Sequence, residues 1–212
     1  LLSLAKDMRS TFYLRVFRKH LGMYLCGFGA EWLFASIFTY FVIFVLQHDP
    51  AMVAGLNSLN SILQLISTAL FIGLCVKKGF SKPYIIALCI VIFAVFLYTS
   101  LWFFHLPVHL ATILMFGITI IFGLGTGGVY YIPWTVYTFL ADVDEIYTGR
   151  RREGIYAGAM TFSGKILRSI IVFVMGAVLS YYGFQSKAHV QPESAVNAIA
   201  VVFCAGVALL AL

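Results

Sequence analysis

Charged residues are scarce in this sequence, and their scarcity excludes a class of protein. Asp, Glu, Lys and Arg make up 10% of the 212 residues, hydrophobic residues make up 62%, and the mean hydropathy is +0.98. Soluble domains carry about 25% charged residues. The composition therefore excludes an ordinary soluble domain and indicates a protein that lies mostly in a lipid bilayer.

Metal-ligand and disulfide patterns are missing as well. The four cysteines stand in apolar runs without a CxxC pair, so we expect small buried residues and neither a zinc site nor a disulfide framework. They are Cys26, Cys75, Cys89 and Cys204. His105 and His109 are four residues apart, but Pro107 between them favours a loop over a metal site. We therefore expect no cofactor and no bound metal.

Long apolar runs dominate the chain. Six of them approach or exceed the ~20 residues with which a helix crosses ~30 Å of hydrocarbon. We expect transmembrane helices at about 21–46, 52–76, 83–104, 110–140, 155–182 and from 195 onward. The predicted fold class is all-α, a polytopic membrane protein with a basic segment at 1–20 and a six-helix bundle at 21–212.

Basic residues gather on one side of the predicted bundle. They lie before the first helix, in the loop at 77–82 and in the triplet at 150–152, whereas Lys187 alone falls on the other side. Because cytoplasmic loops carry the Lys and Arg excess, the basic side is predicted to be cytoplasmic, with the N-terminus inside. Topology thus explains the net charge of +6, and no nucleic-acid partner is expected.

The organisation of the chain resembles half of a larger assembly. It begins at Leu1 instead of Met and ends inside an apolar run at Leu212, so we interpret it as a fragment. Six spans fit two three-helix repeats of opposite orientation, as in half of a secondary transporter. An N-terminal six-helix half is then the expected partner.

The stretch GLGTGG at 123–128 has the GxGxxG spacing of a dinucleotide site. That fingerprint needs a strand before it and a helix after it, whereas these glycines fall within a predicted membrane span. Two interpretations remain. The glycines let neighbouring helices pack closely, or they form a bend with Pro133 that brings the backbone near a solute.

Aromatic side chains follow the glycines. Tyr130 and Trp134 are four residues apart and share a helix face. They fit an aromatic belt at the membrane interface, and they also fit a surface on which a ring-shaped solute stacks.

Two cations interrupt the fifth apolar run near its middle. Lys165 and Arg168 lie one helical turn apart, and Thr161 lies one turn earlier on the same face. A cation at a helix centre costs about 2.5–3.5 kcal/mol on insertion scales, so this face is expected to meet water or a partner. Glu31 lies at a similar depth in the first run. It fits an ion pair that locks two helices, a solute- or proton-linked pair, or local snorkelling.

The stretch PWTVYTFLADVDEIYTGRRREGIYAGAMTFSGK contains an ordered series of charges: Asp142 and Glu145, then Arg151 and Glu153, then Lys165. This series resembles the glycoside-pentoside-hexuronide:cation symporters of the major facilitator superfamily, of which melibiose permease is the best-studied type, where helices ten and eleven join. The loop KKGFSKP resembles a degenerate copy of the superfamily's basic loop between helices eight and nine. The resemblance covers essentially the whole chain as helices seven to twelve, with the last one truncated.

The resemblance implies a sugar or glycoside carrier of the bacterial inner membrane, driven by Na⁺ or H⁺ and working by alternating access. Position by position, the residues that it implies for the sugar pathway are Tyr130, Thr161, Gly164 and Lys165. A cytoplasmic charged network that helps to hold one conformation is implied for Asp142, Glu145, Arg151 and Glu153. The family's cation-binding carboxylates belong to the N-terminal half.

Arg168 departs from the family pattern, since melibiose-type relatives have a small residue there. A guanidinium binds a carboxylate or sulfonate through two parallel hydrogen bonds, which favours an anionic solute such as a hexuronide. The expected substrate-binding residues are Tyr130, Trp134, Thr161, Gly164, Lys165 and Arg168. Glu31 is the expected counter-charge.

Two other functions compete with this one. The first is a carrier of lipid or another solute with the same fold. The second is a membrane-embedded transferase that binds a divalent cation through Asp142, Asp144 and Glu145. The sequence lacks a nucleophile–base arrangement and a second acidic cluster, and the following arginines favour a solvated ion-pair cluster. We therefore expect a transporter and not an enzyme.

Overall fold

The computed structural model describes residues 10–104, 106–149, 152–186, 188 and 190–211. Within these ranges the chain is helical and contains no strand. Six helical segments are long and apolar enough to cross a membrane. The predicted fold class is therefore confirmed, and His105 and Arg151 lie outside the described residues.

The first and last spans each contain a π-helical turn. α2 (Arg15–Tyr40) continues directly into η1 (Phe41–Val45). The sixth span consists of α7 (Glu193–Val201), η2 (Val202–Gly206) and α8 (Val207–Ala211). α2 begins six residues earlier than predicted, so the expected boundary between residues 20 and 21 lies inside a helix.

The four spans between them are uninterrupted α-helices. They are α3 (Pro50–Lys78), α4 (Ser81–Phe104), α5 (Val108–Thr148) and α6 (Glu153–Tyr181). Proline starts α3, where its missing N–H would have no intrahelical partner. Gly79 ends α3 with a φ of 72°, a conformation that glycine adopts without steric cost.

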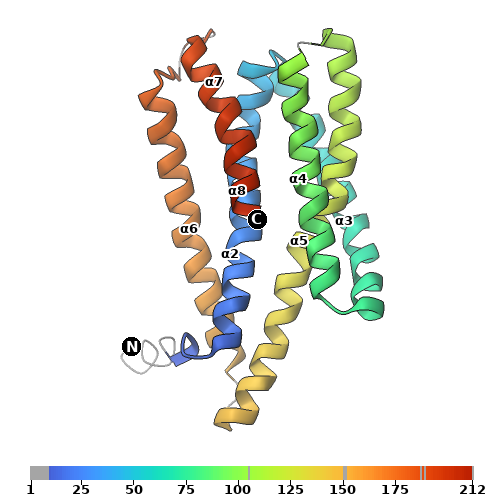
Figure 1. Ribbon diagram of the computed structural model, residues 1–212, viewed down its shortest axis with the longest axis vertical. Helices are drawn as coiled ribbons and strands as arrows, with labels where there is room; N and C mark the ends of the chain where they lie inside the picture. The colour runs from blue at the N-terminus through green and yellow to red at the C-terminus, as the bar shows by residue number, and fades with distance from the viewer. Residues whose placement is uncertain (1–9, 105, 150–151, 187, 189, 212) are drawn as a thin grey trace.

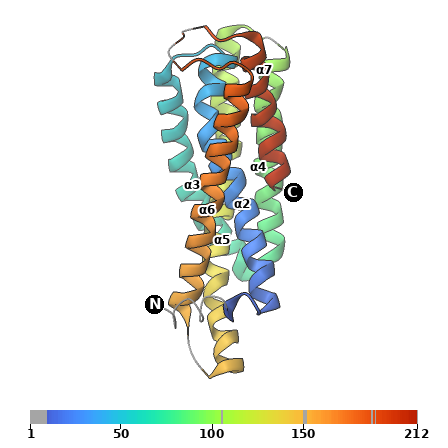
Figure 2. The ribbon, with the colours of Figure 1, turned by 90° about the vertical axis from the view of Figure 1, so that its left-hand side faces the viewer.

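α2 and α5 lie at the centre of the bundle. α6 and the sixth span pack on α2, and α3 and α4 pack on α5. In Figure 1, α6 lies at one edge and α3 and α4 lie toward the other. The view turned by 90° places α4 and α7 on one broad side of the molecule and the upper part of α3 on the other (Figure 2).

α5 is longer than the bilayer requires. Its 41 residues extend over about 62 Å, whereas a bilayer with its headgroups measures about 40–45 Å. Its last turns project past the other helices (Figure 1). The prediction that this span ends at Leu140 was wrong, because the charged stretch after it continues the helix as far as Gly149, which ends it at a φ of 67°.

The glycines at 123–128 are packing residues. A Cβ on Gly127 would lie 2.7 Å from both the Ser67 side chain and the Thr68 backbone nitrogen of α3. A Cβ on Gly125 would lie 3.0 Å from the Ala87 backbone oxygen of α4. α5 therefore fits between two helices at close range, and it stays helical through Pro133. The packing interpretation is confirmed.

Only one of the four cysteines is fully buried. All four are free thiols; Cys75 is buried and Cys204 half-buried, whereas Cys26 and Cys89 are exposed on the bundle. The expectation that all four are buried in the core was wrong. A small apolar side chain suits an acyl chain as well as a protein core, so hydropathy does not distinguish the two surroundings.

Candidate solute site and the charged network

A buried carboxylate lies in the middle of α2. Glu31 is only 5% exposed, and its Oε1 atom has no hydrogen-bond partner. Burying an ionised group without a partner is costly, so such groups mark places where a proton, an ion or a partner is exchanged.

Groups from three helices approach one another near this carboxylate. The Tyr130 hydroxyl of α5 lies within electrostatic range of both the Glu31 carboxylate and the Arg168 guanidinium of α6. Among the described residues, no ion pair joins Glu31 to Lys165 or Arg168. The arrangement therefore places an acid, a phenol and a guanidinium in one region without fixing the acid to either cation.

The cations of α6 lie on the surface of this six-helix unit. Lys165, Arg168 and Thr161 are exposed, and Arg168 lines a shallow open pocket with Ser169. Lys165 is about 18 Å along α6 from Glu153, close to the middle of a helix of 29 residues. Lys165 thus lies near the middle of the helix, and its depth in the bilayer stays a prediction.

Gly164 brings α6 against aromatic side chains of α2. A Cβ on Gly164 would lie 2.8 Å from the Tyr24 hydroxyl and 2.9 Å from the Trp32 ring. The ring of Phe28 lies between them in sequence and packs 4.9 Å from Tyr130, centroid to centroid. These contacts explain why glycine is needed one position before Lys165.

The aromatic cluster extends to Trp134. Its ring centroid lies 5.8 Å from that of Tyr24, and the residue is 37% exposed. The Tyr130 hydroxyl lies within electrostatic range of Arg168, near the middle of α5, and the choice between an aromatic belt and a stacking surface stays a prediction. The α2 members of this cluster were not among the residues predicted from the sequence. Their spacing of four residues, Tyr24, Phe28 and Trp32, was the signal that could have found them.

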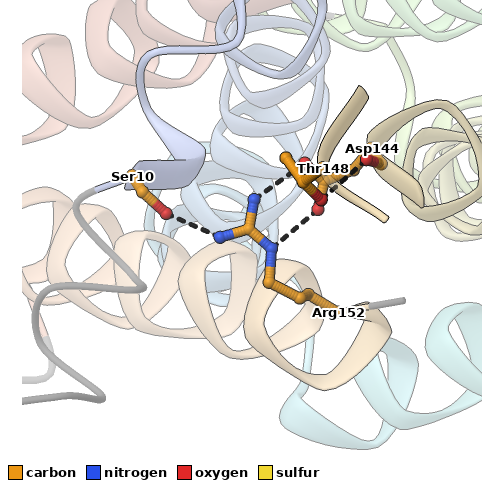
Figure 3. A network of polar contacts seen from close by, with 4 residues as sticks. All are labelled: Ser10, Asp144, Thr148 and Arg152. Atoms are coloured by element: carbon orange, nitrogen blue, oxygen red, sulfur yellow. Dashed lines mark hydrogen bonds and ion pairs between the residues drawn. The ribbon is translucent and has the colours of Figure 1, made fainter. Parts of the chain in front are cut away.

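A second polar site lies where α5 projects from the bundle. Arg152 donates from Nε to Oδ2 of Asp144 at 2.8 Å and from Nη2 to Oδ1 at 2.7 Å. Its Nη1 atom donates to the Ser10 hydroxyl at 2.7 Å (Figure 3). The guanidinium thus joins the end of α5, the start of α6 and the segment before α2.

This ion pair is shielded from water. The Asp144 side chain is 0% exposed and that of Arg152 is 14% exposed. An acidic residue and an arginine do pair here, as predicted. The pair is buried, whereas a solvated cluster was expected. Asp142 and Glu145 are exposed, Glu153 is half-buried at the start of α6, and their role in a network with Arg151 stays a prediction.

The acidic residues do not gather into a metal site. Within the described ranges, no group of three or more His, Cys, Asp or Glu side chains could hold a metal ion. Asp144 binds Arg152 with both oxygens instead. The arrangement expected for a metal-dependent transferase is therefore not formed by these side chains.

Comparison with known proteins identifies the family. Residues 2–212 match the model of the family described as MFS/sugar transport protein, where MFS denotes the major facilitator superfamily. The chain belongs to this family. Six membrane-capable helices and membership of this transporter superfamily make it a multi-pass membrane protein, and the family resemblance seen in the sequence is confirmed.

Two relatives show how much of a full transporter the chain represents. A Synechocystis protein named as an uncharacterized symporter is 31% identical over 209 residues, covering 93% of this chain and 36% of its own length. An Escherichia coli K12 protein provisionally named as a glycoside/cation symporter is 29% identical over 96 residues, or 45% of this chain and 20% of its own length. The chain thus spans about a third of the length of the first relative.

Proposed function

We propose that the full-length protein is a secondary active transporter that moves a sugar or glycoside together with Na⁺ or H⁺ by alternating access. The chain described here supplies one six-helix half, and an N-terminal half of the same protein supplies the other. Family membership and the names of the two relatives support the transport of a sugar with a cation. The bacterial inner membrane is the proposed location.

The observation that carries the proposal is the pair of cations halfway along α6. Lys165 and Arg168 are exposed at a depth where hydrocarbon surrounds a membrane protein. Insertion costs of about 2.5–3.5 kcal/mol for each cation at such a depth make a lipid-facing position unfavourable. A hydrated pathway between two halves removes this cost, and it places both cations where a solute passes.

The proposed solute is an anionic sugar such as a hexuronide. Arg168 binds the carboxylate through two parallel hydrogen bonds, and Lys165 contributes a second positive charge. Tyr130 and Trp134 offer ring faces for the sugar. Thr161 lies exposed on the same face of α6 as the cations, and the buried Gly164 holds this part of α6 close to α2.

Glu31 serves as the counter-charge in this proposal. Its carboxylate lies close enough to Tyr130 to interact with it, and Tyr130 also interacts with Arg168. The carboxylate balances the cations when the solute is absent, and the solute anion replaces it when bound. The coupling-ion site itself is proposed to lie mainly in the N-terminal half.

Uptake measurements with the full-length protein in proteoliposomes test the site. The probes are radiolabelled methyl glucuronide and the neutral methyl glucoside. Arg168→Ala is expected to lower glucuronide uptake about 10- to 100-fold, the worth of a hydrogen bond to a charged group, and to lower glucoside uptake much less. Lys77→Ala removes an exposed cation at the end of α3 and serves as the matched control.

Two outcomes contradict the proposal at different levels. Unchanged uptake in both Lys165→Ala and Arg168→Ala would remove the site assignment. Equal losses for the charged and the neutral probe would remove the anionic-sugar assignment and leave the transporter assignment in place.

A further inference from the structure

A row of polar side chains runs along α3 inside the membrane span. Its members are Asn57, Ser61, Gln64 and Thr68, spaced by three or four residues and therefore aligned on one helix face. Asn57 and Ser61 are exposed, and Gln64 and Thr68 are half-buried. We call these four residues the α3 polar stripe.

The stripe differs from the lipid-facing side of the same helix. Leu65, Ile62 and Ile66 are exposed by 76%, 60% and 52%, and all three are apolar. The two hydroxyls of the stripe donate to the backbone one turn earlier, Ser61 to the Asn57 oxygen and Thr68 to the Gln64 oxygen. The side-chain amides of Asn57 and Gln64 have no hydrogen-bond partner among the described residues.

Unpaired amides are unfavourable in hydrocarbon. Moving an amide from water into an alkane costs about 4–8 kcal/mol when nothing replaces its hydrogen bonds. Two such amides on one face therefore indicate contact with water, with a polar solute or with other polar groups.

The direction of the stripe follows from helix geometry. Each stripe residue comes directly after a residue that packs inward, as Gln64 follows Leu63 and Thr68 follows Ser67, which contact Gly123 and Gly127 of α5. One residue turns the helix by about 100°, so the stripe lies about a quarter turn from the packing face.

The cations of α6 also lie about a quarter turn from the face with which their helix packs on its neighbour. Lys165 comes directly after Gly164, and Arg168 directly after Leu167, and both of these preceding residues pack against α2. α3 and α6 run in opposite directions and lie toward opposite edges of the bundle (Figure 1). The upper part of α3 lies on the broad side opposite α4 and α7 (Figure 2), and each polar face lies about a quarter turn from the face that packs on its own central helix, α5 for α3 and α2 for α6.

The two faces also match in depth. Gln64 lies about 21 Å along α3 from its last residue Lys78, and Arg168 lies about 22 Å along α6 from its first residue Glu153. These two helix ends lie at the same end of the bundle. The amide of Gln64 thus stands near the level of the cations on the other flank, and that of Asn57 lies about 10 Å further along α3.

We propose that the α3 polar stripe is a second, uncharged wall of the solute pathway, where the amides of Asn57 and Gln64 bind hydroxyl groups of a polyhydroxylated solute. An amide offers both a donor and acceptors, which matches a hydroxyl group. The cations of α6 bind the acidic group of the same solute from the opposite flank. This inference rests on the proposed transport of a sugar and adds the surface that recognises its neutral part.

Cysteine labelling in the full-length protein tests the wall. All native cysteines are first replaced by serine, because Cys26 and Cys89 are exposed. Gln64→Cys is expected to react with a charged, membrane-impermeant methanethiosulfonate reagent more than about tenfold faster than Leu65→Cys, because the reactive thiolate forms in water. Saturating methyl glucoside is expected to slow the labelling of Gln64→Cys.

Uptake kinetics test the binding role. Gln64→Ala and Asn57→Ala are each expected to raise the KM for methyl glucoside about 2- to 10-fold, the worth of one hydrogen bond between neutral groups. Ile62→Ala is the matched control on the apolar side of α3. Equal and slow labelling of Gln64→Cys and Leu65→Cys would overturn the proposal that the stripe lines the solute pathway. It would indicate that another part of the protein covers the stripe.

The two proposals fail in distinguishable ways. Fast labelling that solute does not slow, together with unchanged KM values, would overturn solute binding by the amides. If the wild-type protein moves neither probe sugar, the proposed function fails, while the labelling contrast still decides whether the stripe meets water.

Discussion

Charged side chains of this protein occupy two opposite surroundings. Asp144 and Arg152 are shielded from water and bind each other with two hydrogen bonds. Lys165 and Arg168 are exposed on α6 and have no acidic partner among the described residues. The first arrangement suits a permanent joint, whereas the second leaves its cations available to a solute.

The buried joint gives a prediction for stability. Arg152→Ala leaves the Asp144 carboxylate buried and unpaired, so it is expected to cost about 3–5 kcal/mol of folding free energy. Asp144→Ala with Arg152→Ala is expected to cost less than the sum of the two single changes, because the pair is removed together. Thermal unfolding of the purified full-length variants in detergent measures both, with the exposed Lys78→Ala as a control. Additive losses would mean that the two side chains do not act as a pair.

Sequence alone located the charges of the proposed solute site better than it located the partners in the Asp144–Arg152 pair. Glu31, Lys165 and Arg168 are visible because an ionisable residue inside an apolar run is conspicuous. The partner of Asp144 was not predictable, since three acidic residues precede three arginines and many pairings satisfy that pattern. Ser10 lies 142 positions from Arg152, and a contact so distant in sequence has no local signal.

At the level of helices, hydropathy predicted the existence of all six spans but misplaced some ends. α5 runs eight residues past its apolar stretch, because a helix that has left the bilayer continues until a residue such as Gly149 ends it. α2 begins six residues before its predicted apolar stretch, because charged residues outside the bilayer form a helix as readily as apolar ones. Composition marks where hydrocarbon begins, and the backbone signals of glycine and proline mark where a helix stops.

Close packing of α5 leads to a second prediction. Gly127→Ala would place a methyl group 2.7 Å from the Thr68 backbone nitrogen, so α3 must move away, at a cost of about 1–3 kcal/mol. Gly117→Ala on the same helix meets nothing within 4 Å and is expected to gain up to about 1 kcal/mol from helix propensity. The fraction of each variant that stays folded after heating in detergent compares them. A Gly127→Ala protein as heat-stable as Gly117→Ala would show that α3 and α5 are not tightly packed.

For the whole molecule, the distribution of basic residues predicts one orientation in the membrane. Arg15, Arg18 and Lys19 lie in the first turns of α2, and Lys77 and Lys78 lie in the last turn of α3, at the same end of the bundle. The positive-inside rule places that end in the cytoplasm.

The two ends of α3 test this orientation within one helix. In a cysteine-free background, Asp49→Cys is expected to react with an impermeant thiol reagent in intact cells. Lys78→Cys is expected to react only after the membrane is permeabilised. Both residues are exposed, so access and not burial decides the result. The reverse pattern would invert the orientation of the whole half.

The length of α5 has a mechanical consequence. One continuous helix carries both Tyr130, beside the proposed solute, and Asp144, which pairs with Arg152 about 21 Å further along the axis. If α5 tilts by about 10° about the position of Tyr130, the helix axis at Asp144 moves sideways by roughly 4 Å. If a bound solute tilts α5, the end of α5 that carries Asp144 moves with it, and Arg152 passes this movement to Ser10 in the segment before α2.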